Sequence, residues 1–168
     1  MFGGPQPVLS INFDGTTNID SLSFSYDGTL ATQYFVTIIE PNTKIPIPIP
    51  VPNIDLLKAP LARQAPTPLR SEQLKPIANE SPMGAALTAL GALFKSADVV
   101  TGNGQLDVIR YGRVFKARQL AAVRGAGDYY DGKYYVKSVT HNIKRGEYKQ
   151  SFSLARGGIG SSVSSVSV

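Results

Sequence analysis

Apolar and polar residues alternate over the last third of the chain in a way that predicts a long antiparallel hairpin. Over residues 147–154, one set of alternate positions is mainly apolar and the other is charged or hydroxyl-bearing: Tyr148, Gln150, Phe152 and Leu154 against Glu147, Lys149, Ser151 and Ser153. This period of two places the sets on opposite faces of a strand. Residues 133–143 are rich in Tyr, Val and Thr. Between the two runs, Lys144-Arg145-Gly146 predicts a turn, because glycine accepts a positive φ at little cost.

Short strands are also predicted at the front of the chain. Residues 8–13, 21–26 and 33–40 are apolar or alternating runs, and Asp-Gly pairs at 14–15 and 27–28 follow the first two. Such short runs between turn signals are typical of an antiparallel sheet.

Prolines at every second position of residues 46–52 predict a different kind of segment. Each proline removes a backbone donor and fixes φ near −65°, so this segment cannot be a central strand. We expect an extended, polyproline-like arm that its isoleucines hold against a surface and that continues through the proline-rich residues 58–82. The aliphatic residues favour packing over a role as a proline-motif ligand.

One helix is predicted at residues 81–98. Ser81 is a good N-cap, Pro82 suits the first helical position, and apolar residues recur at spacings of three and four. Beyond it we expect a turn at 101–104, a short strand at 105–109 and a loop at 125–127. Residues 113–124 fit either a strand or a helix, and the Gly/Ser-rich residues 157–168 are expected to be flexible. The fold class is therefore mainly β with one helix (α+β).

The charge is unevenly distributed. The chain has 168 residues and a formal net charge of +5. From residue 101 onward there are eleven Lys and Arg against four Asp and Glu, whereas residues 1–60 hold two lysines and five acids. The basic half could face nucleic acid or an acidic protein, or it could be an ordinary solvated strand face. No run of about 18 apolar residues is present, so we expect no membrane insertion by this chain.

Catalytic chemistry has little support. The chain has no cysteine and one histidine, which excludes thiolate chemistry and any two-histidine metal site. His141 is expected to share a strand face with Tyr135, Lys137 and Val139 and to be structural. The sequence lacks a Gly-x-Ser-x-Gly elbow, and no Lys-Ser/Thr follows its glycine-rich end. We therefore predict no catalytic, cofactor-binding or metal-binding residues, with a small hydrolase as the least favoured function.

Tyrosines interleave with lysines and arginine along the predicted hairpin, at residues 129–149. This arrangement can bind single-stranded nucleic acid by stacking and charge. It is equally typical of cross-strand aromatic pairs in a twisted sheet. A nucleic-acid-binding β module is the alternative function, but we expect nucleic acid not to be the partner.

Residues 131–156 follow the pattern Asp-Gly-x-Tyr-x-Val-x-x-Val-x-His-x-Ile-x-x-Gly-x-Tyr-x-x-x-Phe-x-Leu-x-Arg. This pattern resembles the closing hairpin of the tail-hub proteins of contractile injection systems. That family includes the phage late control protein D group. Residues 19–43 are also similar to that family. The resemblance covers roughly 19–43 and 83–156, which is the later half of a typical hub. Either a partner chain supplies the other half, or this is a reduced hub or a relative with another place in the baseplate.

The resemblance implies an antiparallel barrel like that of tail-tube subunits, with an extended proline-rich arm, and a structural role. Hubs form a trimeric ring that joins the hexameric inner tube to the trimeric spike, so a homotrimer, or an assembly with tube, spike and other baseplate proteins, is expected. The implied location is a phage-like particle assembled in the bacterial cytoplasm, with release from the cell left open. We divide the chain into 1–43 (strands of the barrel), 44–82 (arm), 83–156 (helix and barrel half) and 157–168 (tail). The expected assembly contacts are Ile45, Ile47, Ile49, Val51, Tyr134, Tyr135, Lys137, Tyr148 and Arg156.

Overall fold

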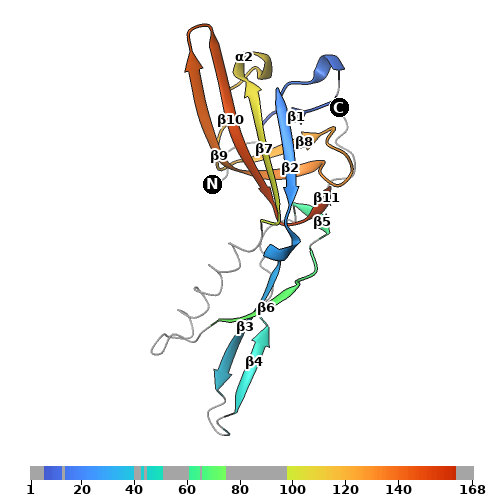
Figure 1. The fold of residues 1–168 in the computed structure, drawn as a ribbon, viewed down its shortest axis with the longest axis vertical. Helices are drawn as coiled ribbons and strands as arrows, with labels where there is room; N and C mark the ends of the chain where they lie inside the picture. Colours follow the sequence, from blue (N-terminus) through green and yellow to red (C-terminus); the bar gives the residue numbers. More distant parts are fainter. Residues whose placement is uncertain are drawn as a thin grey trace. The chain divides into compact units, whose positions relative to one another are not determined.

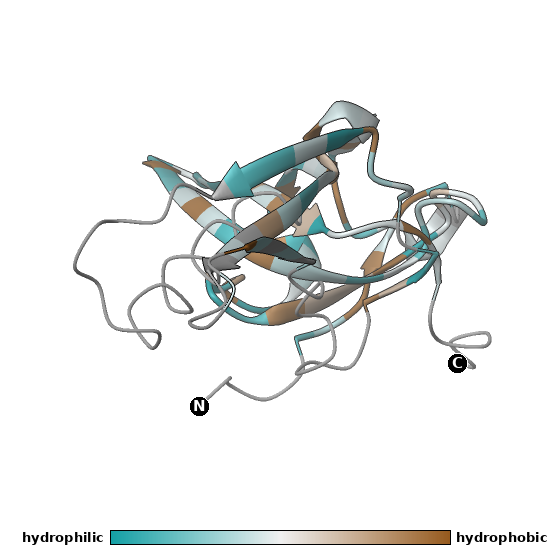
Figure 2. Ribbon diagram, turned by 90° about the horizontal axis from the view of Figure 1, so that it is seen from below, coloured by the Kyte–Doolittle hydropathy of each residue, from teal (hydrophilic) through white to brown (hydrophobic). Residues whose placement is uncertain are grey.

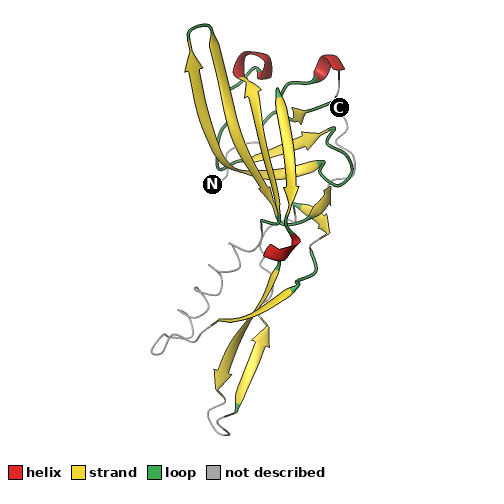
Figure 3. Cartoon of the chain, in the orientation of Figure 1, coloured by secondary structure: helices red, strands yellow, loops and turns green. Residues whose placement is uncertain are grey.

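The computed structural model describes residues 6–12, 14–39, 43, 45–50, 61–64, 66–74 and 98–161. The chain divides into two compact units, and each is described by itself. Unit 1 comprises residues 1–26, 61–65 and 100–168, and unit 2 comprises residues 27–60 and 66–99. The described part is mainly β, which confirms the predicted fold class (Figure 3).

Unit 1 is built on a six-stranded sheet that is curled like half of a barrel (Figure 1). The strand order is β1-β8-β9-β10-β7-β2, and the pairing is antiparallel except between β1 and β8. The strands are β1 (Leu9–Ser10), β2 (Ser21–Tyr26), β7 (Val100–Asp107), β8 (Leu120–Arg124), β9 (Gly132–Lys144) and β10 (Glu147–Arg156). The short helices η1 (Asp14–Thr16) and α2 (Val108–Tyr111) lie in the connections.

The predicted hairpin is confirmed as β9 and β10. Gly146 has φ 79°, as the turn requires. The alternation also holds: Gln150, Phe152 and Leu154 are buried, whereas Ser151 and Ser153 are half-exposed. Figure 2 shows apolar and polar residues alternating along the strands. The front strands are confirmed as well, with β2 at the predicted bounds and β1 reduced to two residues.

The turn predicted at residues 101–104 was wrong, because these residues form the middle of β7. Gly102 and Gly104 lie there because large rings from the neighbouring strands cross them. A Cβ on Gly102 would be 2.8 Å from the Phe24 ring, and one on Gly104 would be 2.6 Å from the Phe152 ring. The strand predicted at 105–109 therefore ends at Asp107, which caps α2 by accepting bonds from the next backbone amides.

A β-bulge at Lys137 corrects another prediction. Ser153 pairs with Ser138 but Leu154 pairs with Val136, so Lys137 has no partner opposite it. The extra residue shifts the alternation. As a result, Tyr135 does not share a face with Val139 and His141, contrary to the sequence prediction.

A two-stranded sheet pairs distant segments within unit 1. Strands β5 (Ala62–Gln64) and β11 (Ile159–Ser161) are antiparallel. Residues 159–161 thus lie in a ladder although they belong to the Gly/Ser segment expected to be flexible. Gly158 permits this pairing, because a Cβ there would lie 2.2 Å from the Gln64 carbonyl oxygen.

Unit 2 contains a three-stranded sheet of order β4-β3-β6. Strand β3 (Thr32–Ile39) pairs antiparallel with β4 (Pro46–Pro50) and parallel with β6 (Arg70–Leu74), and η2 (Gly28–Leu30) precedes β3. The prediction that the proline run is extended and not central is confirmed, but it pairs with its own chain as a β-strand. Because proline has no N–H, only Ile47 and Ile49 can donate from β4 to β3, which places the proline nitrogens on the outer edge.

The helix predicted at 81–98 lies outside the described residues except for Asp98. Residues 113–119, whose structure the sequence left open, have no regular structure, and β8 begins only at Leu120.

Replacing Gly104 with alanine should destabilise unit 1 by about 1–3 kcal/mol, the usual range for overpacking a filled core. The new methyl group would meet the Ser21 carbonyl oxygen and the Phe152 ring, both at 2.6 Å. Urea unfolding would measure the loss. Gly15→Ala is the control, because nothing lies within 4 Å of a Cβ there. Equal stability of the two variants would contradict the packing argument.

Candidate functional site

An uncharged polar surface occupies the middle of the unit 1 sheet, on the face opposite its core. Residues directly across a ladder share a face, so the register of β2, β7, β10 and β9 defines it. One row across these strands is Ser21, Gln105, Ser151 and Thr140; the next is Ser23, Asn103, Ser153 and Ser138, with Ser25 and Thr101 beyond it. We call these ten residues the hydroxyl–amide face. It bears hydrogen-bonding groups without charge or large apolar area.

Charged residues gather where this face reaches the end of β7. Asp20 forms ion pairs with Arg110 and Lys149, and Lys149 also lies 3.1 Å from Glu147. The hydrogen bond and charge of Glu147, with a smaller contribution from Asp20, raise the pKa of Lys149 above its ordinary value. These side chains are solvent-accessible, so the pairs set orientation more than stability.

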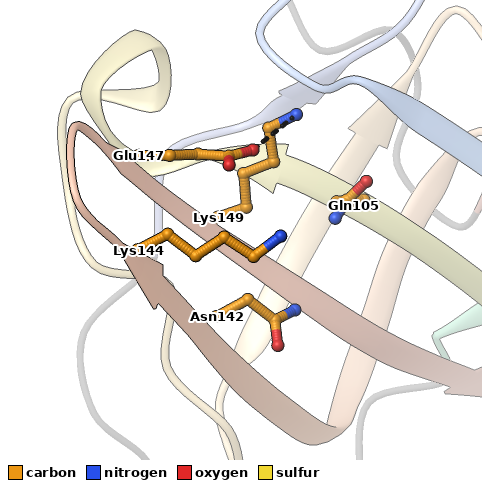
Figure 4. Close-up of a pocket in the computed structure, with 5 residues that line it drawn as sticks. All are labelled: Gln105, Asn142, Lys144, Glu147 and Lys149. Carbon is orange, nitrogen blue, oxygen red and sulfur yellow. Dashed lines mark ion pairs between the residues drawn. The ribbon is translucent and has the colours of Figure 1, made fainter.

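A pocket of about 160 Å³ opens beside these ion pairs. Figure 4 shows its lining residues, which come from β7, β9 and β10: Gln105, Asn142, Lys144, Glu147 and Lys149. Its volume is below the roughly 300–1,000 Å³ of pockets that enclose small-molecule ligands. It therefore fits a single polar group better than a substrate.

Arg156 is a buried cation held by backbone carbonyls. It is 1% exposed, and its guanidinium donates hydrogen bonds to the carbonyl oxygens of Gly158 (2.9 Å), Asp131 (2.8 Å) and Tyr129 (2.6 Å). Burial lowers its pKa from the ordinary value, while Tyr134 and Asp131 act in the opposite direction. The planar guanidinium group of Arg156 thus links the end of β10, the loop before β9 and the residue before β11.

An aromatic cluster surrounds this cation. The guanidinium carbon of Arg156 lies 4.4 Å from the centroid of the buried Tyr134 ring, a cation–π geometry. Phe24 stacks on Tyr130, with centroids 4.9 Å apart, and contacts Tyr134 at 5.4 Å. The Tyr134 hydroxyl donates to the Tyr130 carbonyl oxygen at 2.7 Å. Desolvation raises the pKa of Tyr134 well above its ordinary value.

A buried amide fixes the segment before β8. The side chain of Gln150 accepts a hydrogen bond from the Phe115 amide (2.8 Å) and donates one to the Phe115 carbonyl oxygen (2.9 Å). Phe115 in turn packs on Phe152 and on Tyr111, whose hydroxyl donates to the Pro7 carbonyl oxygen. Sequence reasoning identified the face of Gln150 but gave no signal for its partner.

The predicted assembly contacts fall into distinct groups. Tyr134 and Arg156 are buried against each other, so they stabilise the chain itself and offer no surface to a partner. Ile45 and Lys137 are exposed, and Tyr135 and Tyr148 are half-buried. Ile47 and Ile49 belong to β4, but their side chains, like all of Val51, lie outside the described residues. These residues therefore belong to both units of the chain.

The described residues do not form a catalytic arrangement around His141. Its Nδ1 lies 2.7 Å from the Tyr148 hydroxyl and 3.3 Å from the Gln150 amide nitrogen. Nowhere in the described ranges do three or more metal-ligating side chains gather. Over the same ranges, every helix is too short or too polar to cross a membrane.

The hairpin tyrosines offer few free faces for stacking. Tyr130 and Tyr134 pack against Phe24, and Tyr148 stacks on His141. Tyr129 is strongly exposed and Tyr135 is half-buried. Because single-strand binding by this chemistry needs several exposed rings beside cations, this arrangement favours the cross-strand interpretation.

Comparison with solved structures finds the same fold in phage tail proteins. The 43 kDa tail protein of prophage MuSo2 from Shewanella oneidensis aligns over 89% of this chain with 11% identity and a TM-score of 0.56. The tail protein from Neisseria meningitidis MC58 aligns over 94% with 12% identity and a TM-score of 0.53. The chain spans 42% and 45% of these proteins. No protein-family model matches the chain, and no curated protein is significantly similar to it in sequence.

Arg156→Lys should destabilise unit 1 by about 2–4 kcal/mol, because an ammonium cannot reach all three carbonyls and hydrogen bonds to a charged group contribute roughly 1.5–3 kcal/mol each. Chemical unfolding would measure the loss. The exposed Arg113→Lys is the matched control and should change stability by less than about 0.5 kcal/mol. An Arg156→Lys variant as stable as the parent chain would contradict the anchoring role.

Alkaline titration should separate the tyrosines. Burial raises the pKa values of Tyr111 and Tyr134 above the ordinary 10.0, so both phenols stay protonated in the folded chain as the pH rises past 10. A raised folded pKa contributes stability below pH 10 that is lost as pH rises further, and these two rings should ionise only with unfolding. Absorbance at about 295 nm with circular dichroism would follow both events. Ionisation of all eight tyrosines before unfolding would contradict this expectation.

Proposed function

We propose that this chain is a structural, non-enzymatic component of a phage-like tail, in the hub that joins the inner tube to the trimeric spike. The observation that carries the proposal is the fold likeness to two phage tail proteins over about nine-tenths of this chain. The resemblance of residues 19–43 and 83–156 to tail hubs gives the more specific position. The chain spans less than half of each of these two structural neighbours, and the proposal covers both a hub completed by a partner chain and a reduced hub.

The chemistry of the hydroxyl–amide face supports a place around a channel. Its two complete rows contain serine, threonine, asparagine and glutamine only. Such a surface stays hydrated and gives a passing polymer neither apolar area nor opposite charge to adhere to. In a ring of subunits, we assign this face to the inner wall, past which material can move without binding.

Assembly into the ring would use the surfaces that remain exposed. We propose a homotrimer, or a hetero-assembly with inner tube, spike and other baseplate proteins. Ile45, Tyr135, Lys137 and Tyr148 remain the proposed contacts with described, accessible side chains. The particle would be assembled in the bacterial cytoplasm.

Light scattering on the purified chain, alone and mixed with candidate tube and spike proteins, should give a trimer or a defined complex. Stable specific interfaces bury on the order of 1,200–2,000 Å² in total, so such a complex should persist during chromatography. The tube protein of an unrelated tail is the control and should not bind. A monomer that ignores both cognate partners would contradict the proposal.

A further inference from the structure

The tip of the β9–β10 hairpin extends past the strand beside it. The last pair between β10 and β7 is Lys149 with Asp107. Two further cross-strand pairs follow before the turn, Tyr148 with Ile143 and Glu147 with Lys144. Figure 1 shows this tip projecting at the end of unit 1 where α2 lies. We call Ile143, Lys144, Arg145 and Gly146 the hairpin tip.

Apolar surface is exposed at this end. Ile143 is 72% exposed, although it continues the core-facing row of the hairpin past the point where the sheet covers it. Ile109, on the adjacent α2, is 77% exposed. Leaving two isoleucines in water costs free energy that a partner could recover by covering them.

Uncompensated positive charge lies at the same end. Arg110 and Lys149 are already paired with acids. Lys144 and Arg145, by contrast, have no carboxylate within 4.0 Å among the described residues. Lys144 lines the small pocket together with the amides of Gln105 and Asn142, and Glu147 there is engaged by Lys149 (Figure 4).

We propose that the hairpin tip is a docking finger that enters a cleft of another protein chain, one wall of which is apolar and the other acidic. Neighbouring residues of a strand face opposite sides, so Ile143 and Lys144 can both be covered only if the partner encloses the tip. The apolar wall packs on Ile143 and Ile109. An Asp or Glu of the other wall enters the pocket and pairs with Lys144, while Arg145 at the turn adds a second cation.

Two features select the partner. Exposed isoleucines beside the cations fit a protein surface better than a phosphate backbone, which offers no apolar wall. The net charge of +5 favours a chain of opposite charge over a second copy of this one, since two cationic tips repel. The identity of the partner as a tail protein rests on the proposed function, whereas the finger itself rests on the geometry above.

The test compares charge-reversed variants in complexes with candidate tube, spike and other baseplate proteins. Lys144→Glu with Arg145→Glu should weaken binding to one of these proteins at least tenfold, measured by biolayer interferometry. Lys116→Glu with Lys133→Glu makes the same change in net charge at exposed positions away from the tip and should bind like the parent chain. Ile143→Asn should also weaken binding, and circular dichroism would verify that each variant is folded.

A zero-length carbodiimide crosslink then identifies the contact, because it joins a lysine amine directly to a carboxylate. We expect mass spectrometry to find Lys144 linked to an Asp or Glu of the neighbouring protein. A link from Lys144 to a second copy of this chain would overturn the choice of partner. Equal binding by both double variants would overturn the finger while leaving the proposed function intact.

An oligothymidine titration separates the nucleic-acid alternative. Loss of oligothymidine binding in the tip variant, with protein binding unchanged, would overturn the proposal in favour of a nucleic-acid contact. Failure of the parent chain to bind any tail protein would instead contradict the proposed function.

Discussion

The burial of one arginine is the constraint on which the organisation of unit 1 depends. Arg156 ends β10, and its guanidinium is satisfied by three backbone carbonyls and the face of Tyr134. A desolvated cation is costly unless its donors are all engaged, so the loop at residues 129–131 and the chain at Gly158 must hold their carbonyls in place. The arginine thereby ties the loop before β9 and the residue before β11 to the end of β10.

Sequence reasoning identified the parts of the fold in which local pattern and tertiary environment agree. The alternation in β2 and β10 reflects a sheet with one buried face, so the period of the apolar residues was enough to predict these strands. It failed for β7, because Gly102 and Gly104 indicate a turn locally and are in a strand only because Phe24 and Phe152 occupy the space above them. The bulge at Lys137 has no local signal at all, since it depends on the register of the opposite strand.

The candidate surfaces were harder to predict than the strands. Arg156 and Tyr134 were expected among the assembly contacts, yet they are buried and contact each other inside the chain. The hydroxyl–amide face requires the register of four strands from three separate parts of the sequence, namely β2, β7 and the β9–β10 hairpin, so no single segment reveals it. The separation of this neutral face from the cationic tip gives the two ends of one sheet different chemistry.

Strand β4 affects how this protein behaves at high concentration. Its outer edge presents carbonyl oxygens without amide donors, because every second residue is a proline. A sheet edge of this kind cannot template another strand, which is the first step of amyloid-like growth. The proline run therefore limits edge-to-edge association of this sheet, and contacts between chains are left to other surfaces.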